Sequence, residues 1–184
     1  MNQIEKYTNE LRPLSIKFSS GNIAIDNFLS SDDALDKTIG ITYVLLDEER
    51  TRIIGYFNIS VSRIDEIRLQ NGEVTYHPLG GAAKINYLAV DSKFQHQLLY
   101  QTNNGDKKYI GDYLLGQCEQ KIWDIHNDIG IAFIYLSSTK EGYHMYRDRN
   151  FYEDLEDDMN VAKNDKDLTC RDLYKYIDDL YYYN

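Results

Sequence analysis

Proline, cysteine and positive charge are all scarce in this 184-residue sequence. Its 2 prolines leave few candidates for rigid linkers. The two cysteines, Cys118 and Cys170, stand far apart and form neither a metal-ligand motif nor a redox motif. We therefore predict two reduced structural thiols and no metal site.

Basic residues are outnumbered by acidic ones. The sequence has 20 Lys and Arg against 30 Asp and Glu, a formal net charge of −10 at pH 7. Such an acidic excess repels phosphate backbones, so general nucleic-acid binding is disfavoured. A local basic pocket for a phosphorylated cofactor is still compatible with this charge.

Long apolar runs are missing as well. No segment approaches the roughly 20 apolar residues that a membrane-spanning helix needs, and residues 1–11 lack the apolar core of a signal peptide. We therefore expect a cytoplasmic protein without a membrane span. The length, with 42% hydrophobic and 27% charged residues, indicates one globular domain. The 17 tyrosines predict a core rich in aromatic rings.

The spacing of apolar residues predicts alternating strands and helices. We expect strands at residues 11–18, 41–47, 53–64, 84–90, 129–137, 151–158 and 168–177. We expect helices at residues 25–29, 32–37, 110–126 and 139–149, and a longer connection at residues 65–83. Successive strands followed by a β-α-β unit predict an α/β (α+β) fold with a mixed central sheet and helices on both faces.

One strand-loop-helix segment has features of an anion site. The strand ends in Tyr-Leu-Ala-Val-Asp at residues 87–91, and Gly111 lies at the start of the helix expected at residues 110–126. A glycine at a helix start exposes backbone N–H groups at the positive end of the helix dipole. Lys107 and Lys108 lie just before it and would add positive charge. This arrangement suits a pyrophosphate.

The order of four segments resembles the GNAT acetyltransferases. The segments are YLAVDSKFQ, KKYIGDYLL, AFIYLSSTK and GYHMYRDRNFYED. Together with the upstream FSSGNIAIDNFL, they are closest to the GNAT subgroup that includes the acetyltransferase toxins of toxin–antitoxin pairs. The resemblance spans residues 11–177 and implies a single GNAT acyltransferase domain over residues 1–184, with a mostly antiparallel sheet.

The chain also departs from the family pattern. Of the glycines in the family's phosphate loop only Gly111 is kept, and an insertion lies between Gln95 and Lys107. In the last helix, Asn150-Phe151 replaces the family's Gly-Phe, and asparagine tolerates a left-handed conformation better than most residues.

The resemblance implies an acetyl-CoA-dependent N-acetyltransferase in which a free amine attacks the thioester. A bulge in the fourth strand would supply the backbone N–H for the oxyanion and would pair with the pantetheine arm. Tyr146 matches the family's acid, which protonates the leaving thiolate. The implied cofactor-binding residues are Leu88, Ala89, Val90, Lys107, Lys108, Tyr109, Ile110, Gly111 and Asp112.

The acceptor and the general base stay open. The acceptor is a small-molecule, peptide or protein amine in the first hypothesis. In the second it is a charged tRNA, which would need a basic patch from Lys84, Lys107, Lys108 and Lys140. The third hypothesis is a GNAT-fold binding or regulatory module without activity, which the altered loop favours. His77 is a candidate base, and the Tyr-rich C-terminal segment is a candidate homodimer contact.

Overall fold

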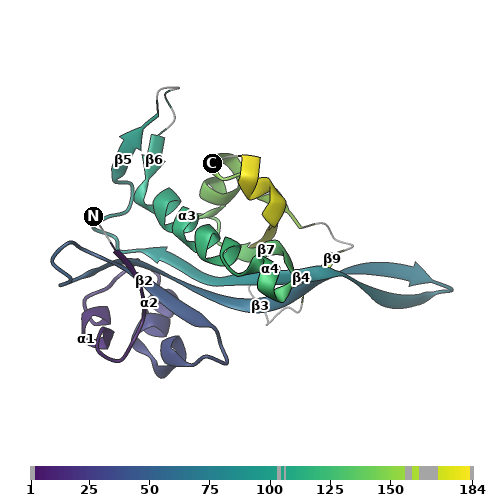
Figure 1. Ribbon diagram of the computed structural model, residues 1–184, viewed down its shortest axis with the longest axis horizontal. Coiled ribbons are helices and arrows are strands. Elements are labelled where there is room, and N and C mark those ends of the chain that lie inside the picture. The colour runs from purple at the N-terminus through teal and green to yellow at the C-terminus, as the bar shows by residue number, and fades with distance from the viewer. Residues whose placement is uncertain (1–2, 103–104, 106, 156–158, 162–169, 183–184) are drawn as a thin grey trace. The chain divides into compact units, whose positions relative to one another are not determined.

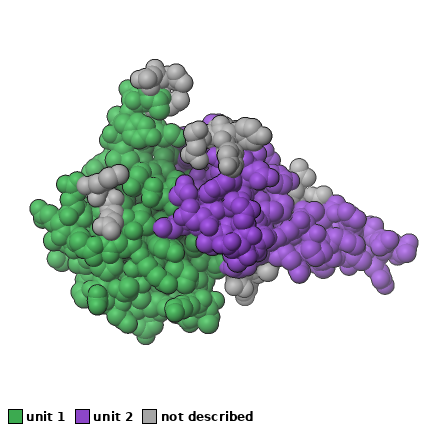
Figure 2. All heavy atoms as spheres, in the orientation of Figure 1, with its two compact units in different colours: residues 1–60, 86–118 green, residues 61–85, 119–184 purple. Residues whose placement is uncertain are grey.

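The computed structural model describes residues 3–102, 105, 107–155, 159–161 and 170–182. The chain divides into two compact units (Figure 2). Unit 1 comprises Met1–Ser60 and Asn86–Cys118, and unit 2 comprises Val61–Ile85 and Glu119–Asn184. Two strands and one helix continue from one unit into the other along the chain. A single domain therefore stays a prediction.

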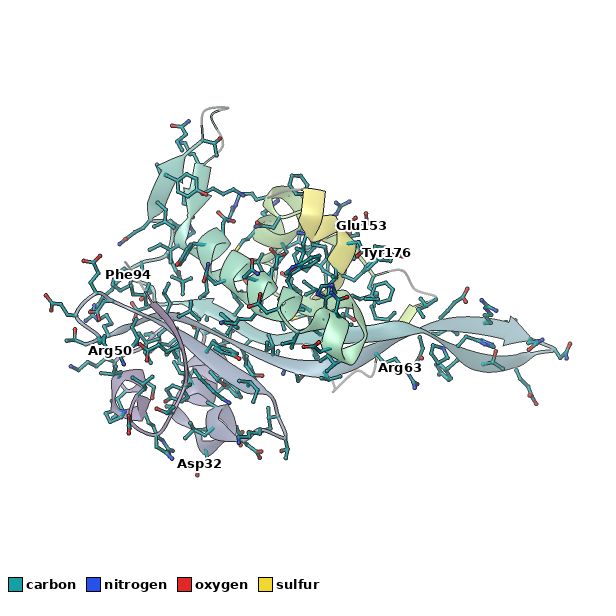
Figure 3. The ribbon with its side chains drawn as sticks, viewed as in Figure 1. Asp32, Arg50, Arg63, Phe94, Glu153 and Tyr176 are labelled. Atoms are coloured by element: carbon teal, nitrogen blue, oxygen red, sulfur yellow. The ribbon has the colours of Figure 1, made fainter. Side chains whose placement is uncertain are left out.

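Unit 1 is built on antiparallel strands in the order β1-β2-β3-β4. Figure 1 labels β2, β3 and β4. Their bounds are β1 Gln3–Lys6, β2 Ile41–Leu46, β3 Ile53–Gln70 and β4 Glu73–Val90, of which residues 53–60 and 86–90 belong to this unit. β1 pairs with β2, and β2 with β3, with Val44 opposite Tyr56. The β2–β3 turn is tied to β1 because the Arg50 guanidinium (Figure 3) pairs with the Glu5 carboxylate.

Helices cover both faces of the strands of unit 1. Tyr56 is fully buried, and its hydroxyl donates to the carbonyl of Ile25 in α2, Ile23–Ser30, at 2.8 Å. Its neighbour Gly55 has the opposite orientation, and a Cβ there would lie 2.9 Å from Leu114 of α3, Ile110–Trp123. Because successive strand residues point to opposite faces, α2 and α3 lie on different faces. The expected helices on both faces are thus present in this unit.

Two smaller helices and one hairpin complete unit 1. They are α1 Arg12–Ser15, the 3₁₀ helix η1 Asp32–Leu35, and the strands β5 Leu98–Gln101 and β6 Lys107–Tyr109, which pair antiparallel. The expectation of a strand at residues 11–18 is wrong. Pro13 lies in the first turn of α1, where its missing N–H costs nothing, and β1 precedes this segment.

Unit 2 continues β3 and β4 and adds strands on both sides of them. The order is β3-β4-β7-β10-β8, with β9 paired to β3. The bounds are β7 Ile131–Ser138, β8 Glu153–Asp154, β9 Met159–Val161 and β10 Arg171–Tyr176. β4 and β7 pair in parallel, whereas β7 and β10 pair antiparallel, with Tyr135 opposite Tyr174. The predicted α/β fold with a mixed, mostly antiparallel sheet is confirmed.

The helical elements of unit 2 are short. They are α4 His126–Ile129, the π-helix η2 Met145–Arg149 and the 3₁₀ helix η3 Ile177–Tyr182. The helix expected at residues 110–126 and the strand expected at residues 129–137 correspond to α3 and β7. Of the strands expected at residues 151–158 and 168–177, residues 156–158 and 168–169 lie outside the described residues.

The expectation of a long connection at residues 65–83 is wrong. β3 runs to Gln70 and β4 starts at Glu73, so the two strands form one long hairpin. The turn is Asn71-Gly72, with φ of 54° and 84°. Positive φ at both central residues defines the turn that best matches strand twist, and Asn-Gly is its strongest sequence signal.

Buried tyrosines make the fold sensitive to alkali. Burial raises the pKa of Tyr135 to about 12, with the Asp172 carboxylate adding to the shift and the Ser137 hydroxyl opposing it. Burial also raises the pKa of Tyr56, from an ordinary value of 10.0. Between the ordinary tyrosine pKa of 10.0 and the raised pKa of about 12 for Tyr135, the unfolded chain binds fewer protons than the folded one. The free energy of unfolding therefore falls as pH rises through this range. Urea unfolding measured from about pH 9 to pH 12 should show this loss; a flat profile would contradict it.

Candidate functional site

The last residues of β4 extend beyond its ladder with β7. The parallel ladder runs from Gly81 opposite Ile131 to Ile85 opposite Leu136, and β4 itself continues to Val90. Among the described residues, the last residue of β4 that pairs with β7 is Ile85. Residues 86–90 therefore have an edge where an extended ligand can add as a strand.

Leu88 and Val90 direct their N–H groups toward this edge. The Asp91 N–H donates to the Ile54 carbonyl of β3 at 2.8 Å, so Asp91 faces β3. Backbone N–H groups alternate in direction along a strand. The N–H of Ala89 therefore points toward β3 as well, and the N–H groups of Leu88 and Val90 point away from β3. The Val90 carbonyl confirms this direction, because it accepts from the Gln95 side chain at 2.9 Å. Of the three residues named from the sequence, Ala89 thus has its N–H on the β3 side.

The alternation of β4 is interrupted just before these residues. Tyr87 stacks on Phe28 of α2 with ring centroids 3.9 Å apart. The Asn86 side chain donates to Asn58 Oδ1 at 2.7 Å and to Ser60 Oγ at 2.9 Å. Asn58 and Ser60 share the α2 face with Tyr56, two and four residues earlier. Asn86 and Tyr87, although consecutive in β4, thus both contact side chains of the α2 face.

A buried polar network holds this irregularity. Asn58 is fully buried, and its amide donates to Thr42 Oγ1 at 2.9 Å, which in turn donates to the Ala34 carbonyl at 2.7 Å. Gly40 borders the network, and a Cβ there would lie 2.5 Å from Asn58 Oδ1. Asn58 and Asn86 were not among the residues predicted from the sequence. Their signal was a polar residue inside each of two apolar strands.

Some backbone N–H groups at the start of α3 are already bound to acceptors within the protein. The Tyr109 N–H donates to the buried Asp112 carboxylate at 3.0 Å, and the Ile110 N–H donates to the Gln97 carbonyl at 3.3 Å. Asp112, the third residue of α3, thus binds the backbone N–H of the residue that precedes the helix, as in a capping box. An anion at this helix start would use the N–H groups that follow, beginning with Gly111.

Lys107 and Lys108 lie on β6, immediately before α3. They pair with Gln101 and Tyr100 of β5, so the segment interpreted as an insertion folds into a hairpin of unit 1. Lys107 is exposed and Lys108 is partly exposed. Lys84, which the tRNA hypothesis invoked, belongs to unit 2, where its ammonium lies 5.7 Å from the centre of the Tyr135 ring.

Tyr146 lies in the π-helix of unit 2 and is 7% exposed. Its ring meets the ring of Tyr152 edge to face, with centroids 5.7 Å apart. A Cβ at Gly142 would lie 3.3 Å from Tyr146 Cε2, so the glycine leaves room for this ring. His77 lies in the β3–β4 hairpin of the same unit, where its Nε2 is 3.2 Å from Thr75 Oγ1. The structure thus places the candidate phosphate loop and the end of β4 in unit 1, and Tyr146 in unit 2.

The described part of the chain contains neither a metal-ligand cluster nor a helix that could span a membrane. No three His, Cys, Asp or Glu side chains among these residues come together as metal ligands do. None of the helices in the same residues combines the length and the apolar character that crossing a membrane requires.

Comparison with known proteins gives similarity at the level of the fold. No protein-family model and no curated protein matches the sequence. Among solved structures, a tyrosine-to-phenylalanine mutant of KacT is 17% identical with a TM-score of 0.71, covering 98% of each chain. AtaTR bound with acetyl-CoA is 16% identical with a TM-score of 0.70, covering 98% of this chain and 96% of that one. AtaT complexed with acetyl-methionyl-tRNAfMet is 14% identical with a TM-score of 0.69, covering 99% and 98%. This chain has the fold of the AtaT and KacT toxins, as expected from its resemblance to the GNAT acetyltransferases.

Proposed function

We propose that this chain is an acetyl-CoA-dependent N-acetyltransferase that acts on a primary amine. The observation that carries the proposal is the end of β4, where Leu88 and Val90 direct N–H groups toward an edge beyond the β7 ladder. An edge of this kind suits the pantetheine arm of acetyl-CoA, and AtaTR, which shares the fold, was solved with acetyl-CoA bound.

Each candidate residue has a role in this proposal. The amine attacks the thioester carbonyl, and the N–H of Leu88 or Val90 stabilises the oxygen that becomes negative. Gly111 and the residues after it offer N–H groups to the pyrophosphate, with Lys107 and Lys108 adding charge. Tyr146 protonates the departing thiolate, since a phenol is protonated at neutral pH. In this proposal the Ala89 side chain packs in the hydrophobic cluster beside α2.

The direct test is calorimetric titration with acetyl-CoA. Binding at micromolar to millimolar concentration, followed by release of free thiol with a panel of primary amines, would support an enzyme. Absence of binding at millimolar acetyl-CoA would overturn the proposal. That result would favour the third hypothesis, a GNAT-fold binding or regulatory module.

Gly111→Glu should abolish acetyl-CoA binding. The new carboxylate would lie beside the phosphates, and because like charges in contact cost several kcal/mol, we expect a loss of at least about 100-fold in affinity. The matched control is Gly116→Glu in the same helix, an exposed position where a Cβ meets nothing within 4 Å. Equal affinities of both variants and the wild type would place the phosphates elsewhere.

A charged tRNA is the second candidate acceptor. The observation in its favour is the AtaT complex with acetyl-methionyl-tRNAfMet, and the net charge of −10 opposes it. Incubating the protein with methionyl-tRNA and radiolabelled acetyl-CoA tests this candidate. Label on the aminoacyl group would select it, whereas label on free amines alone would select a small-molecule, peptide or protein acceptor.

Partners and compartment stay predictions. Solved neighbours include complexes with an antitoxin C-terminus, with DNA and with tRNA. From these complexes we expect a protein or a tRNA as the partner of this chain. Light scattering of the purified chain would decide whether the Tyr-rich C-terminal segment forms the candidate homodimer contact or packs on its own core. Fractionation of cells would test the predicted cytoplasmic location.

A further inference from the structure

A buried ion pair lies inside unit 2. Lys175 on β10 is 5% exposed at its side chain, and Glu119 in the last turns of α3 is 14% exposed. The Lys175 ammonium lies 3.2 Å from Glu119 Oε1. Removing two charges from water is costly, and a pair this deep needs further hydrogen bonds to hold it.

Further contacts of the pair go to the short segment Asn150–Tyr152. The Lys175 ammonium donates to the Asn150 carbonyl at 3.1 Å and lies 5.4 Å from the centre of the Tyr152 ring. The Tyr152 hydroxyl donates to Glu119 Oε1 at 3.1 Å. The pair therefore holds the chain on both sides of Phe151.

The segment between these two anchors is strained. Phe151 has φ of 60° and is about half exposed. A bulky residue in the left-handed region is an outlier, and it persists only where the surroundings fix it. The Asn150 amide adds a bond to the Met145 carbonyl at 2.7 Å. The flanking residues Asn150 and Tyr152 thus contribute bonds that hold this turn.

The same segment determines the position of Tyr146. The Tyr152 N–H donates to the Tyr146 carbonyl at 3.0 Å, and the two rings are in edge-to-face contact. Tyr146 is thus held at its backbone and at its ring by a residue whose hydroxyl is bound to Glu119.

We propose that Lys175 and Glu119 are positioning residues that hold Tyr146 in one conformation through Asn150 and Tyr152. The catalytic consequence of this positioning rests on the proposed function, in which Tyr146 is the acid. The conformational part of the proposal is independent of catalysis.

The test uses the full chain with 3-fluorotyrosine incorporated at position 146. Because Lys175→Met alone leaves a buried carboxylate and can unfold unit 2, the main variant is Glu119→Leu with Lys175→Met. This double variant removes both charges and keeps apolar volume. We expect one narrow fluorine resonance in the wild type. In the double variant we expect a shifted and broadened or split resonance, with faster hydrogen exchange at the Tyr152 amide. An unchanged resonance and amide would overturn the proposal.

The second readout is release of CoA from acetyl-CoA by the same proteins. Since a misplacement of about 1 Å can cost about 100-fold in rate, we expect a loss of 10- to 100-fold in the double variant, at unchanged acetyl-CoA affinity. An unchanged rate in a folded double variant would overturn the positioning role. The matched control is Arg12→Met, which removes an exposed ion pair with Asp32 and should leave both readouts as in the wild type. If the wild type binds no acetyl-CoA, the proposed function fails, and the fluorine experiment still decides the positioning.

Discussion

Replacing Tyr146 by phenylalanine is expected to slow acetyl transfer by about 10²- to 10⁴-fold, the range that general acid catalysis contributes. The ring is kept, so its contacts with Tyr152 and Gly142 are retained and the fold is preserved. Acetyl-CoA affinity should change little, because the missing hydroxyl acts on the leaving thiolate. Turnover is measured by release of free thiol and affinity by calorimetry.

The matched control for this variant is Tyr143→Phe. Tyr143 precedes the same π-helix, and its hydroxyl donates to the Asp154 carboxylate at 2.9 and 3.0 Å. It has no part in the proposed chemistry, so Tyr143→Phe should turn over like the wild type. Unchanged turnover in Tyr146→Phe would remove this residue from the acid role. Equal losses in both variants would indicate a general disturbance of the segment.

The largest change in stability is expected from Lys175→Met. It leaves the Glu119 carboxylate buried without its ammonium, and breaking a buried pair in this way costs about 3–5 kcal/mol. The free energy of unfolding of a typical domain is about 5–15 kcal/mol, so the expected loss is a large fraction of it. Urea denaturation measures the free energy of unfolding.

Adding Glu119→Leu to Lys175→Met should recover most of that loss, because two apolar side chains replace the ion pair. Arg12→Met, at an ion pair whose side chains are 39% and 89% exposed, should cost about 0–1 kcal/mol and serves as the control. Equal stability of Lys175→Met and this control would show that the pair contributes little. No recovery in the double variant would show that the lysine acts through other contacts.

Some of the fold could be predicted from sequence because local patterns were strong. The periodic face from Ile110 to Ile122 and the apolar run of β7 gave α3 and β7 close to their observed bounds. Residues 11–18 misled because Leu, Ile and Phe at that spacing match a strand as well as a short helix, and the information lay in Pro13. The long hairpin was missed because its outer half alternates weakly, although Asn71-Gly72 marked the turn.

The site was predictable in part. The segment at Leu88 and Val90 came from a resemblance that spans the whole chain, and no local pattern told which N–H faces the free edge. That distinction needs the hydrogen bonds of Asp91 and Gln95. Glu119 and Lys175 stand 56 residues apart on a helix and a strand, where a lysine or a glutamate normally indicates solvent. Only the packing of unit 2 reveals them as partners.

The tip of the β3–β4 hairpin offers a place to modify the molecule. Asn71 and Gly72 are exposed, as are the residues on either side of them, and neither belongs to a hydrophobic cluster. Exposed loop tips of this kind tolerate inserted domains and new chain ends. A fluorescent reporter or an affinity handle can therefore be grafted between Asn71 and Gly72.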